Sequence, residues 1–156
     1  MTNKQIRSAL AALALLSALT LAAGAQDRAL DGTWLGDEGL ELRLGNGNLE
    51  LRLNHEELET GFMFLQKGTF SSSGGNITVT YTHVHGSLLH ESGIAIGIRS
   101  DGWYTLDEIE AAVRRTPGGE FSAPFIRQQF APMFITETAP VSNNRFTLQY
   151  GTFTRQ

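Results

Sequence analysis

The sequence of 156 residues contains no cysteine. This absence excludes disulfide bonds, thiolate metal sites, a cysteine nucleophile and a lipid-modified N-terminal cysteine. A chain that forms no disulfide must rely on its hydrophobic core for stability.

Basic residues are also scarce. The chain has 12 lysines and arginines against 16 aspartates and glutamates. A mildly acidic chain is a poor candidate for binding nucleic acid, and it has no basic stripe suited to anionic lipid. We therefore expect no nucleic acid partner.

Long hydrophobic runs are missing except for one at residues 9–22. It is short for a membrane span, which needs roughly 20 residues. Lys4 and Arg7 precede the run and small residues follow it at 23–25, which is the order of a secretory signal peptide. We expect residues 1–25 to be removed, no membrane span to remain, and the mature protein to be secreted or periplasmic.

Residues 26–156 are predicted to form one domain. These 131 residues are enough for one hydrophobic core, and no linker or low-complexity tract interrupts them. Loss of Lys4 and Arg7 leaves ten basic and sixteen acidic residues, which gives a net charge of −6. We expect a monomer.

The clearest pattern in the mature sequence is LELRL-GNGN-LELRL at residues 40–53. Leucines alternate with charged residues, so all leucines lie on one face of a strand and all charges on the other. Residues 45–48 tolerate the positive φ that a tight turn needs. The pattern predicts an antiparallel hairpin with one buried and one solvated face.

Further strands are predicted at 61–70, 76–85, 94–98, 125–130, 133–138 and 145–155. Residues 105–115 have a helical period instead, with Thr105 and Glu108 as a capping box. About eight strands and one short α-helix indicate an all-β fold. We expect an antiparallel up-and-down barrel, because closure removes the exposed edges of the sheet.

Two short motifs resemble lipocalins and related calycin barrels. LDGTW at residues 30–34 resembles the Gly-x-Trp element that opens the first lipocalin strand. GTFTR at residues 151–155 resembles the last strand of short bacterial lipocalin-like domains. The resemblance implies a lipocalin-like barrel in which Trp34 plugs one end and Arg155 or Arg145 packs on its ring. A typical lipocalin carries its helix after the last barrel strand, whereas here three predicted strands follow the helix.

TYTHVHG at residues 80–86 contains two histidines that share the parity of the apolar residues in strand 76–85. His83 and His85 are therefore predicted to point inward near the barrel rim, and His90 follows five residues later. Two imidazoles and a third ligand can bind zinc, so these three histidines are the candidate metal ligands. The alternative is that they are half-buried hydrogen-bonding residues at a strand end.

No catalytic residues are predicted. Asp107, Glu108 and Glu110 are accounted for by capping and surface roles on the helix, and no serine lies in a nucleophile elbow. The turn at 45–48 lacks the following helix that a phosphate loop requires. His55, in a glutamate-rich turn, is predicted to be solvated. We expect the protein not to be an enzyme.

The aromatic residues of the mature chain form either an apolar pocket or a solid core. They are Phe62, Phe64, Phe70, Tyr81, Phe125, Phe130, Phe134, Phe146 and Tyr150.

Three functions remain open. The first hypothesis is an exported, non-enzymatic binding protein whose barrel holds a small apolar or amphiphilic ligand. The second is a metal-handling protein that uses the His-x-His pair. The third is a filled barrel that acts through its surface, as an inhibitor or an envelope interaction protein.

Overall fold

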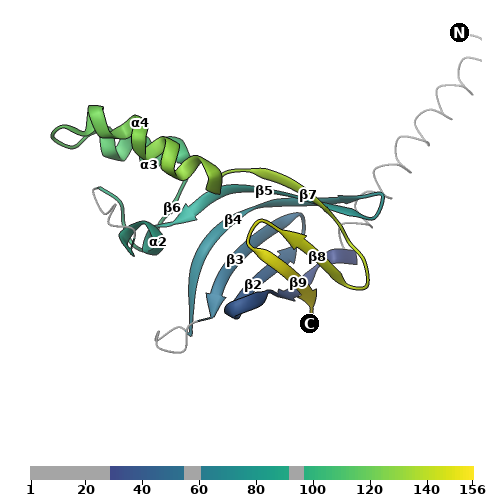
Figure 1. Cartoon of the computed structure of the whole chain (residues 1–156). Coiled ribbons are helices and arrows are strands. Elements are labelled where there is room, and N and C mark those ends of the chain that lie inside the picture. Colours follow the sequence, from purple (N-terminus) through teal and green to yellow (C-terminus); the bar gives the residue numbers. More distant parts are fainter. Residues whose placement is uncertain (1–28, 55–60, 92–96) are drawn as a thin grey trace, which may run out of the picture.

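The computed structural model describes residues 29–54, 61–91 and 97–156. Within these ranges, nine strands form one antiparallel sheet that curls into a half-barrel (Figure 1). The strands are β1 (Gly32–Leu35), β2 (Leu40–Gly45), β3 (Asn48–Asn54), β4 (Phe62–Ser73), β5 (Asn76–His85), β6 (Trp103–Tyr104), β7 (Thr136–Pro140), β8 (Arg145–Leu148) and β9 (Gly151–Arg155). Their order is β6-β5-β4-β3-β2-β1-β9-β8, and β7 also pairs with β5. The predicted antiparallel all-β fold is confirmed.

The hairpin predicted at residues 40–53 consists of β2 and β3. Leu42 lies opposite Leu51, Leu44 lies opposite Leu49, and all four leucines are at most 4% exposed. The turn residues Asn46 and Gly47 have φ angles of 51° and 75°. These left-handed conformations are typical of the tight turns that join antiparallel strands.

Apolar side chains pack against one another in the interior of the half-barrel. Thirteen of the described residues form one contiguous cluster, and none of them is more than 5% exposed. They are Trp34, Leu42, Leu44, Leu49, Leu51, Phe70, Ile77, Val79, Tyr81, Ala139, Phe146, Leu148 and Phe153. This packing agrees better with a solid core than with an apolar pocket, because the buried side chains contact one another.

Trp34 is a fully buried member of this core. Its indole is fully buried, and its ring centroid lies 4.6 Å from that of Phe146. The indole Nε1 donates a hydrogen bond to the carbonyl oxygen of Leu30 at 2.9 Å. The guanidinium of Arg155 lies over the indole, 5.7 Å from the ring centroid. Of the two arginines predicted for this contact, the structure therefore identifies Arg155, and the half-barrel is compatible with a calycin-like barrel.

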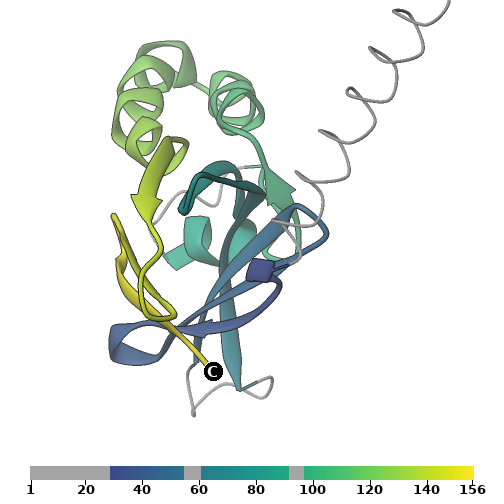
Figure 2. The same cartoon turned by 90° about the vertical axis from the view of Figure 1, so that its right-hand side faces the viewer.

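Short helices interrupt the strands. They are α2 (Gly86–Glu91), α3 (Leu106–Arg114) and α4 (Gly119–Phe130), with 3₁₀ turns η1 (Asp37–Gly39) and η2 (Ala131–Met133). α3 and α4 pack side by side beyond one end of the half-barrel (Figure 2). A second apolar cluster joins this helical pair to the sheet, and its buried members are Val84, Leu89, Ile98, Ile109, Ala112 and Phe130.

The segment 125–130, predicted as a strand, is the second half of α4. Ala123, Ile126 and Phe130 are spaced three and four residues apart, so they form one helical stripe. Six residues are too few to distinguish this period from a strand.

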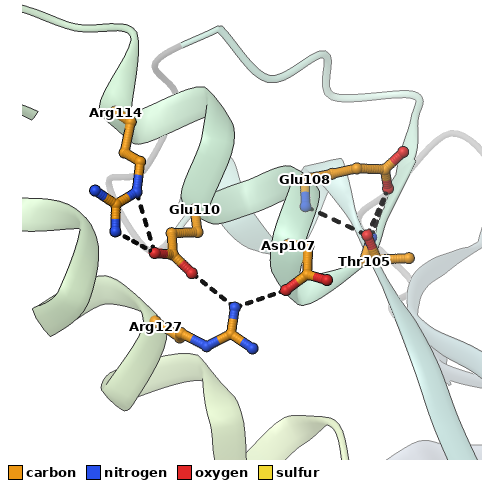
Figure 3. Close-up of polar contacts among 6 residues, drawn as sticks. All are labelled: Thr105, Asp107, Glu108, Glu110, Arg114 and Arg127. Carbon is orange, nitrogen blue, oxygen red and sulfur yellow. Dashed lines mark hydrogen bonds and ion pairs between the residues drawn. The ribbon is translucent and has the colours of Figure 1, made fainter. Parts of the chain in front are cut away.

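The predicted capping box is present at the N-terminus of α3. Thr105 Oγ1 accepts a hydrogen bond from the backbone N–H of Glu108 at 3.3 Å (Figure 3). The Glu108 carboxylate in turn accepts one from the backbone N–H of Thr105 at 2.8 Å. This pairing satisfies two backbone donors that the first turn of a helix leaves free.

Ion pairs connect α3 to α4 (Figure 3). Arg127 of α4 lies 2.6 Å from both Asp107 and Glu110 of α3. Oε1 of Glu110 also accepts a hydrogen bond from Nη2 of Arg114, one turn later in the same helix, at 2.6 Å. These contacts agree with the structural roles expected for the helix carboxylates.

Replacing Thr105 with alanine is expected to lower the free energy of unfolding by about 1 kcal/mol, because the cap acceptor is lost. Urea denaturation measures this change. Thr105→Ser keeps the hydroxyl and is expected to keep most of the stability. An equal loss in both variants would contradict the capping role.

Some predictions lie outside the described residues. They are the signal peptide at residues 1–25, the solvated turn at His55, and most of the strand at 94–98. Residues 97 and 98, which are described, do not belong to a strand. In the described part of the chain, no helix is long and apolar enough to cross a membrane.

Candidate functional site

A bulge in β5 changes the orientation of the residues that follow it. Lys67 pairs with His83, whereas the next residue on β4, Gly68, pairs with Tyr81. Thr82 is therefore an extra residue in β5. One extra residue shifts the alternation of a strand by one position, so that side chains beyond it exchange faces.

The two strand histidines consequently lie on the outer face of the sheet, opposite the interior of the half-barrel. Val84 between them is fully buried in the second cluster, while His83 and His85 are partly exposed. The inward orientation predicted from parity is wrong. Gly68 allows the close approach of the strands at the bulge, since a Cβ there would lie 1.9 Å from the carbonyl oxygen of Thr80.

The three candidate zinc ligands have separate hydrogen-bond partners. Nδ1 of His83 lies 2.8 Å from the hydroxyl of the preceding threonine, and Nδ1 of His85 lies 2.7 Å from Oγ of Ser87. Nε2 of His90, on α2, lies 2.7 Å from the carbonyl oxygen of Ile98. Among the described residues, no three His, Cys, Asp or Glu side chains are grouped to hold a metal ion. Zinc binding stays a prediction, which this geometry does not favour.

The outer face carries a cluster of aromatic rings. The centroid of His85 lies 4.7 Å from that of Trp103 and 5.3 Å from that of Phe64. Phe64 also lies 5.7 Å from Trp103 and 5.0 Å from Phe62. All four side chains are partly exposed. We call Phe62, Phe64, His85 and Trp103 the outer aromatic cluster.

Two cations lie over rings of the outer aromatic cluster. Lys67 Nζ is 5.0 Å from the Trp103 centroid, and the guanidinium carbon of Arg52 is 4.4 Å from the Phe62 centroid. At such distances a cation is attracted to the negative face of an aromatic ring. Arg52 is itself held by Glu41, with Nη2 2.7 Å from Oε1. These contacts fix the positions of the rings.

Burial lowers the pKa of both histidines of this face, which favours their neutral form. Burial lowers the pKa of His83, Lys67 lowers it further, and Glu108 opposes the change. Burial also lowers the pKa of His85, against a smaller opposite effect of Asp101. A neutral imidazole has one donor and one acceptor. Both rings use Nδ1 for contacts within the described chain, which leaves Nε2 of each for a partner.

A row of polar side chains extends the outer face toward the β2–β3 hairpin. Arg43, Glu50, Lys67 and His83 are successive cross-strand partners on β2, β3, β4 and β5. An open groove of about 520 Å³ lies along this row, and its lining includes Arg43, Asn48, Glu50 and Lys67. Lys67 lines the groove and also contacts Trp103, so the groove and the outer aromatic cluster adjoin at this residue.

Sequence reasoning missed this face because it assigned Phe62 and Phe64 to the interior. A second bulge makes Leu65 an extra residue in β4, so that Arg52 pairs with Phe64 while Leu51 pairs with Gln66 two residues later. Both phenylalanines therefore lie on the outer face. Bulges depend on pairing between strands, and no local signal in the sequence marks this one.

Comparison of the chain with models of known protein families, with curated proteins and with solved structures finds no match. No residue role is therefore transferred from a relative. The outer face has to be interpreted from its own geometry and chemistry.

Proposed function

We propose that the mature protein is an exported, non-catalytic binding protein that holds an oligosaccharide on its outer face. One observation supports this proposal: the outer aromatic cluster and an open groove of polar side chains adjoin at Lys67. Sugar rings present C–H groups that pack against the negative faces of aromatic rings. Their hydroxyls both donate and accept hydrogen bonds, as the side chains of the groove do.

The groove offers donors and acceptors in a mixture suited to hydroxyl groups. Arg43 and Lys67 donate, Glu50 accepts, and Asn48 does both. Arg43 is held by Glu41 through Nε, but its side chain is 52% exposed, so its other N–H groups face solvent. The Nε2 atoms of the two outer histidines add a further donor or acceptor at the aromatic end.

Other partner classes fit this face less well. The net charge of −6 expected for the mature chain opposes nucleic acid, although bases also stack on aromatic rings. The centre of a protein–protein interface is depleted of charged residues, whereas Arg43, Glu50 and Lys67 line this groove. A small apolar ligand in the barrel interior would have to displace the packed core.

The absence of catalysis is part of the proposal. Asp107 and Glu110 are paired with Arg127, and Glu108 caps α3, so these carboxylates have structural roles. Export of the protein and its monomeric state stay predictions. Binding without chemistry is consistent with a surface site that does not exclude water.

Affinity electrophoresis in gels containing soluble neutral or acidic polysaccharides tests the proposal. We expect at least one polysaccharide to retard the wild-type protein, and calorimetry then gives its affinity. Trp103→Ala is expected to weaken binding by about tenfold, the effect of losing roughly 1.4 kcal/mol of ring contact. Phe121→Ala is the matched control, because this ring is 90% exposed but lies on α4, outside the cluster.

A second variant of the outer aromatic cluster distinguishes loss of binding from loss of the folded structure. His85→Ala removes a ring from the same cluster, and circular dichroism confirms that each variant is folded. Retardation by none of the polysaccharides would contradict the proposal. So would unchanged affinity in folded Trp103→Ala and His85→Ala proteins.

A further inference from the structure

A group of polar side chains lies inside the half-barrel, at the seam between β7 and β8. These two strands are in contact, but in the described sheet β7 is paired with β5 and β8 with β9. Glu137 of β7 lies opposite Val79, whose side chain belongs to the core. Oε2 of Glu137 accepts a hydrogen bond at 2.7 Å from the backbone N–H of Gln149, in the turn after β8. This bond connects the two sides of the seam.

Three oxygens near the seam are buried without a hydrogen-bond partner among the described residues. They are Oε1 of Glu137, Oε1 of Gln66 and the hydroxyl of Tyr81. Gln66 and Tyr81 are each only 1% exposed. Buried polar atoms almost always have a partner, so three in one place point to a ligand.

Tyr150 connects these side chains. Its ring meets that of Tyr81 edge to face, with centroids 5.5 Å apart, and the amide of Gln66 lies beside its hydroxyl. The Tyr81 hydroxyl faces Glu137 closely enough for each to affect the pKa of the other, but without the geometry of a hydrogen bond. Side chains from β4, β5, β7 and the β8–β9 turn thus surround one polar site.

The site lacks positive charge. Burial raises the pKa of Glu137, and burial together with the nearby Glu137 raises the pKa of Tyr81. Burial likewise raises the pKa of Tyr150 to about 12. In the described part of the chain, Glu137 forms no ion pair. A buried carboxylate is unfavourable unless a cation or a proton neutralises it.

We propose that the seam site, formed by Gln66, Tyr81, Glu137 and Tyr150, binds a small primary-ammonium cation. An ammonium group has N–H donors for the three unpartnered oxygens and a positive charge for the carboxylate. The two tyrosine rings add faces that attract a cation. Glu137 and Tyr150 are partly exposed, so the site borders solvent. This site is independent of the oligosaccharide face.

Thermal unfolding in methylammonium chloride tests the proposal, with sodium chloride at equal ionic strength as the reference. We expect the unfolding midpoint of the wild type to rise with methylammonium concentration. Glu137→Gln keeps an acceptor for the Gln149 N–H but removes the charge, and we expect about tenfold weaker binding. Glu120→Gln changes an exposed carboxylate on α4 and should keep the full response.

Tyr81→Phe distinguishes a ligand site from a packing defect. This variant removes only the unpartnered hydroxyl, and we expect its midpoint to respond less to methylammonium than that of the wild type. The alternative is that the buried hydroxyl binds no ligand and only lowers the stability of the protein. In that case Tyr81→Phe is more stable than the wild type, and neither protein responds to methylammonium. That result would overturn the proposal, as would equal responses of the wild type and Glu137→Gln.

Discussion

Replacing Trp34 with alanine is expected to lower the free energy of unfolding by about 3–5 kcal/mol. The indole is fully buried, packs on Phe146 and is covered by Arg155, so its removal leaves a cavity in the core. Trp34 lies in β1 between β2 and β9, and this pairing limits collapse into the cavity. Domains of this kind have a total stability of about 5–15 kcal/mol, so the loss is large. Urea denaturation followed by circular dichroism measures it.

Leu35→Ala is the matched control for Trp34→Ala. Leu35 is the next residue in the same strand, but its side chain is 40% exposed. Its replacement is expected to change stability by about 0.5 kcal/mol or less, as for surface positions generally. A similar loss in both variants would contradict the contribution of Trp34 to the packing of the core.

Removing the Glu41 carboxylate is expected to cost about 3 kcal/mol of stability. The side chains of Glu41 and Arg52 are only 8% and 10% exposed, and their charged atoms lie 2.7 Å apart. Glu41→Ala leaves the Arg52 guanidinium buried, and Nε of that group already has no partner among the described residues. The double variant Glu41→Leu/Arg52→Met removes both charges and is expected to recover most of the loss. A double variant as unstable as the single variant, in the same urea assay, would contradict this account.

The same pair predicts a dependence of stability on pH. Burial alone would raise the pKa of Glu41, but the hydrogen bond from Arg43 and the attraction of Arg52 together lower it below its ordinary value. The pair therefore contributes fully to the free energy of unfolding above the pKa of Glu41 in the unfolded chain, which is about 4.3. This contribution is lost as the pH falls through the pKa of Glu41 in the folded protein. The stability of Glu41→Leu/Arg52→Met should fall less steeply in acid than that of the wild type. If the free energy of unfolding depends on pH in the same way in both proteins, Glu41 does not contribute to the acid sensitivity of the wild type.

Features determined by a few neighbouring residues were predictable from the sequence. Alternating leucines and a glycine–asparagine turn specify the β2–β3 hairpin, and Thr105 with Glu108 specifies the start of α3. A family resemblance implied that Arg155 or Arg145 packs on Trp34, and in the structure Arg155 does so. Each of these features depends on local geometry or on a single pair of residues.

The outer aromatic cluster was not predictable in the same way. It depends on extra residues at Leu65 and Thr82, and each of them reverses the faces of the strand beyond it. Parity arguments assume an uninterrupted ladder, so they placed His83 and His85 inside, and Phe64 was assigned to the interior only because it is aromatic. The partners of Trp103 come from two other strands, and no spacing along the chain indicates that they meet.

The two tryptophans offer the most direct test of the oligosaccharide proposal. Trp103 belongs to the outer aromatic cluster, whereas Trp34 is fully buried and donates its indole N–H to Leu30. In a ¹H–¹⁵N correlation spectrum, each indole N–H gives its own signal. On titration with an oligosaccharide from the polysaccharide that retards the protein, we predict that the Trp103 signal shifts and the Trp34 signal does not. A shift of Trp34 with Trp103 unchanged, or no shift of either at saturating oligosaccharide, would contradict binding on the outer face.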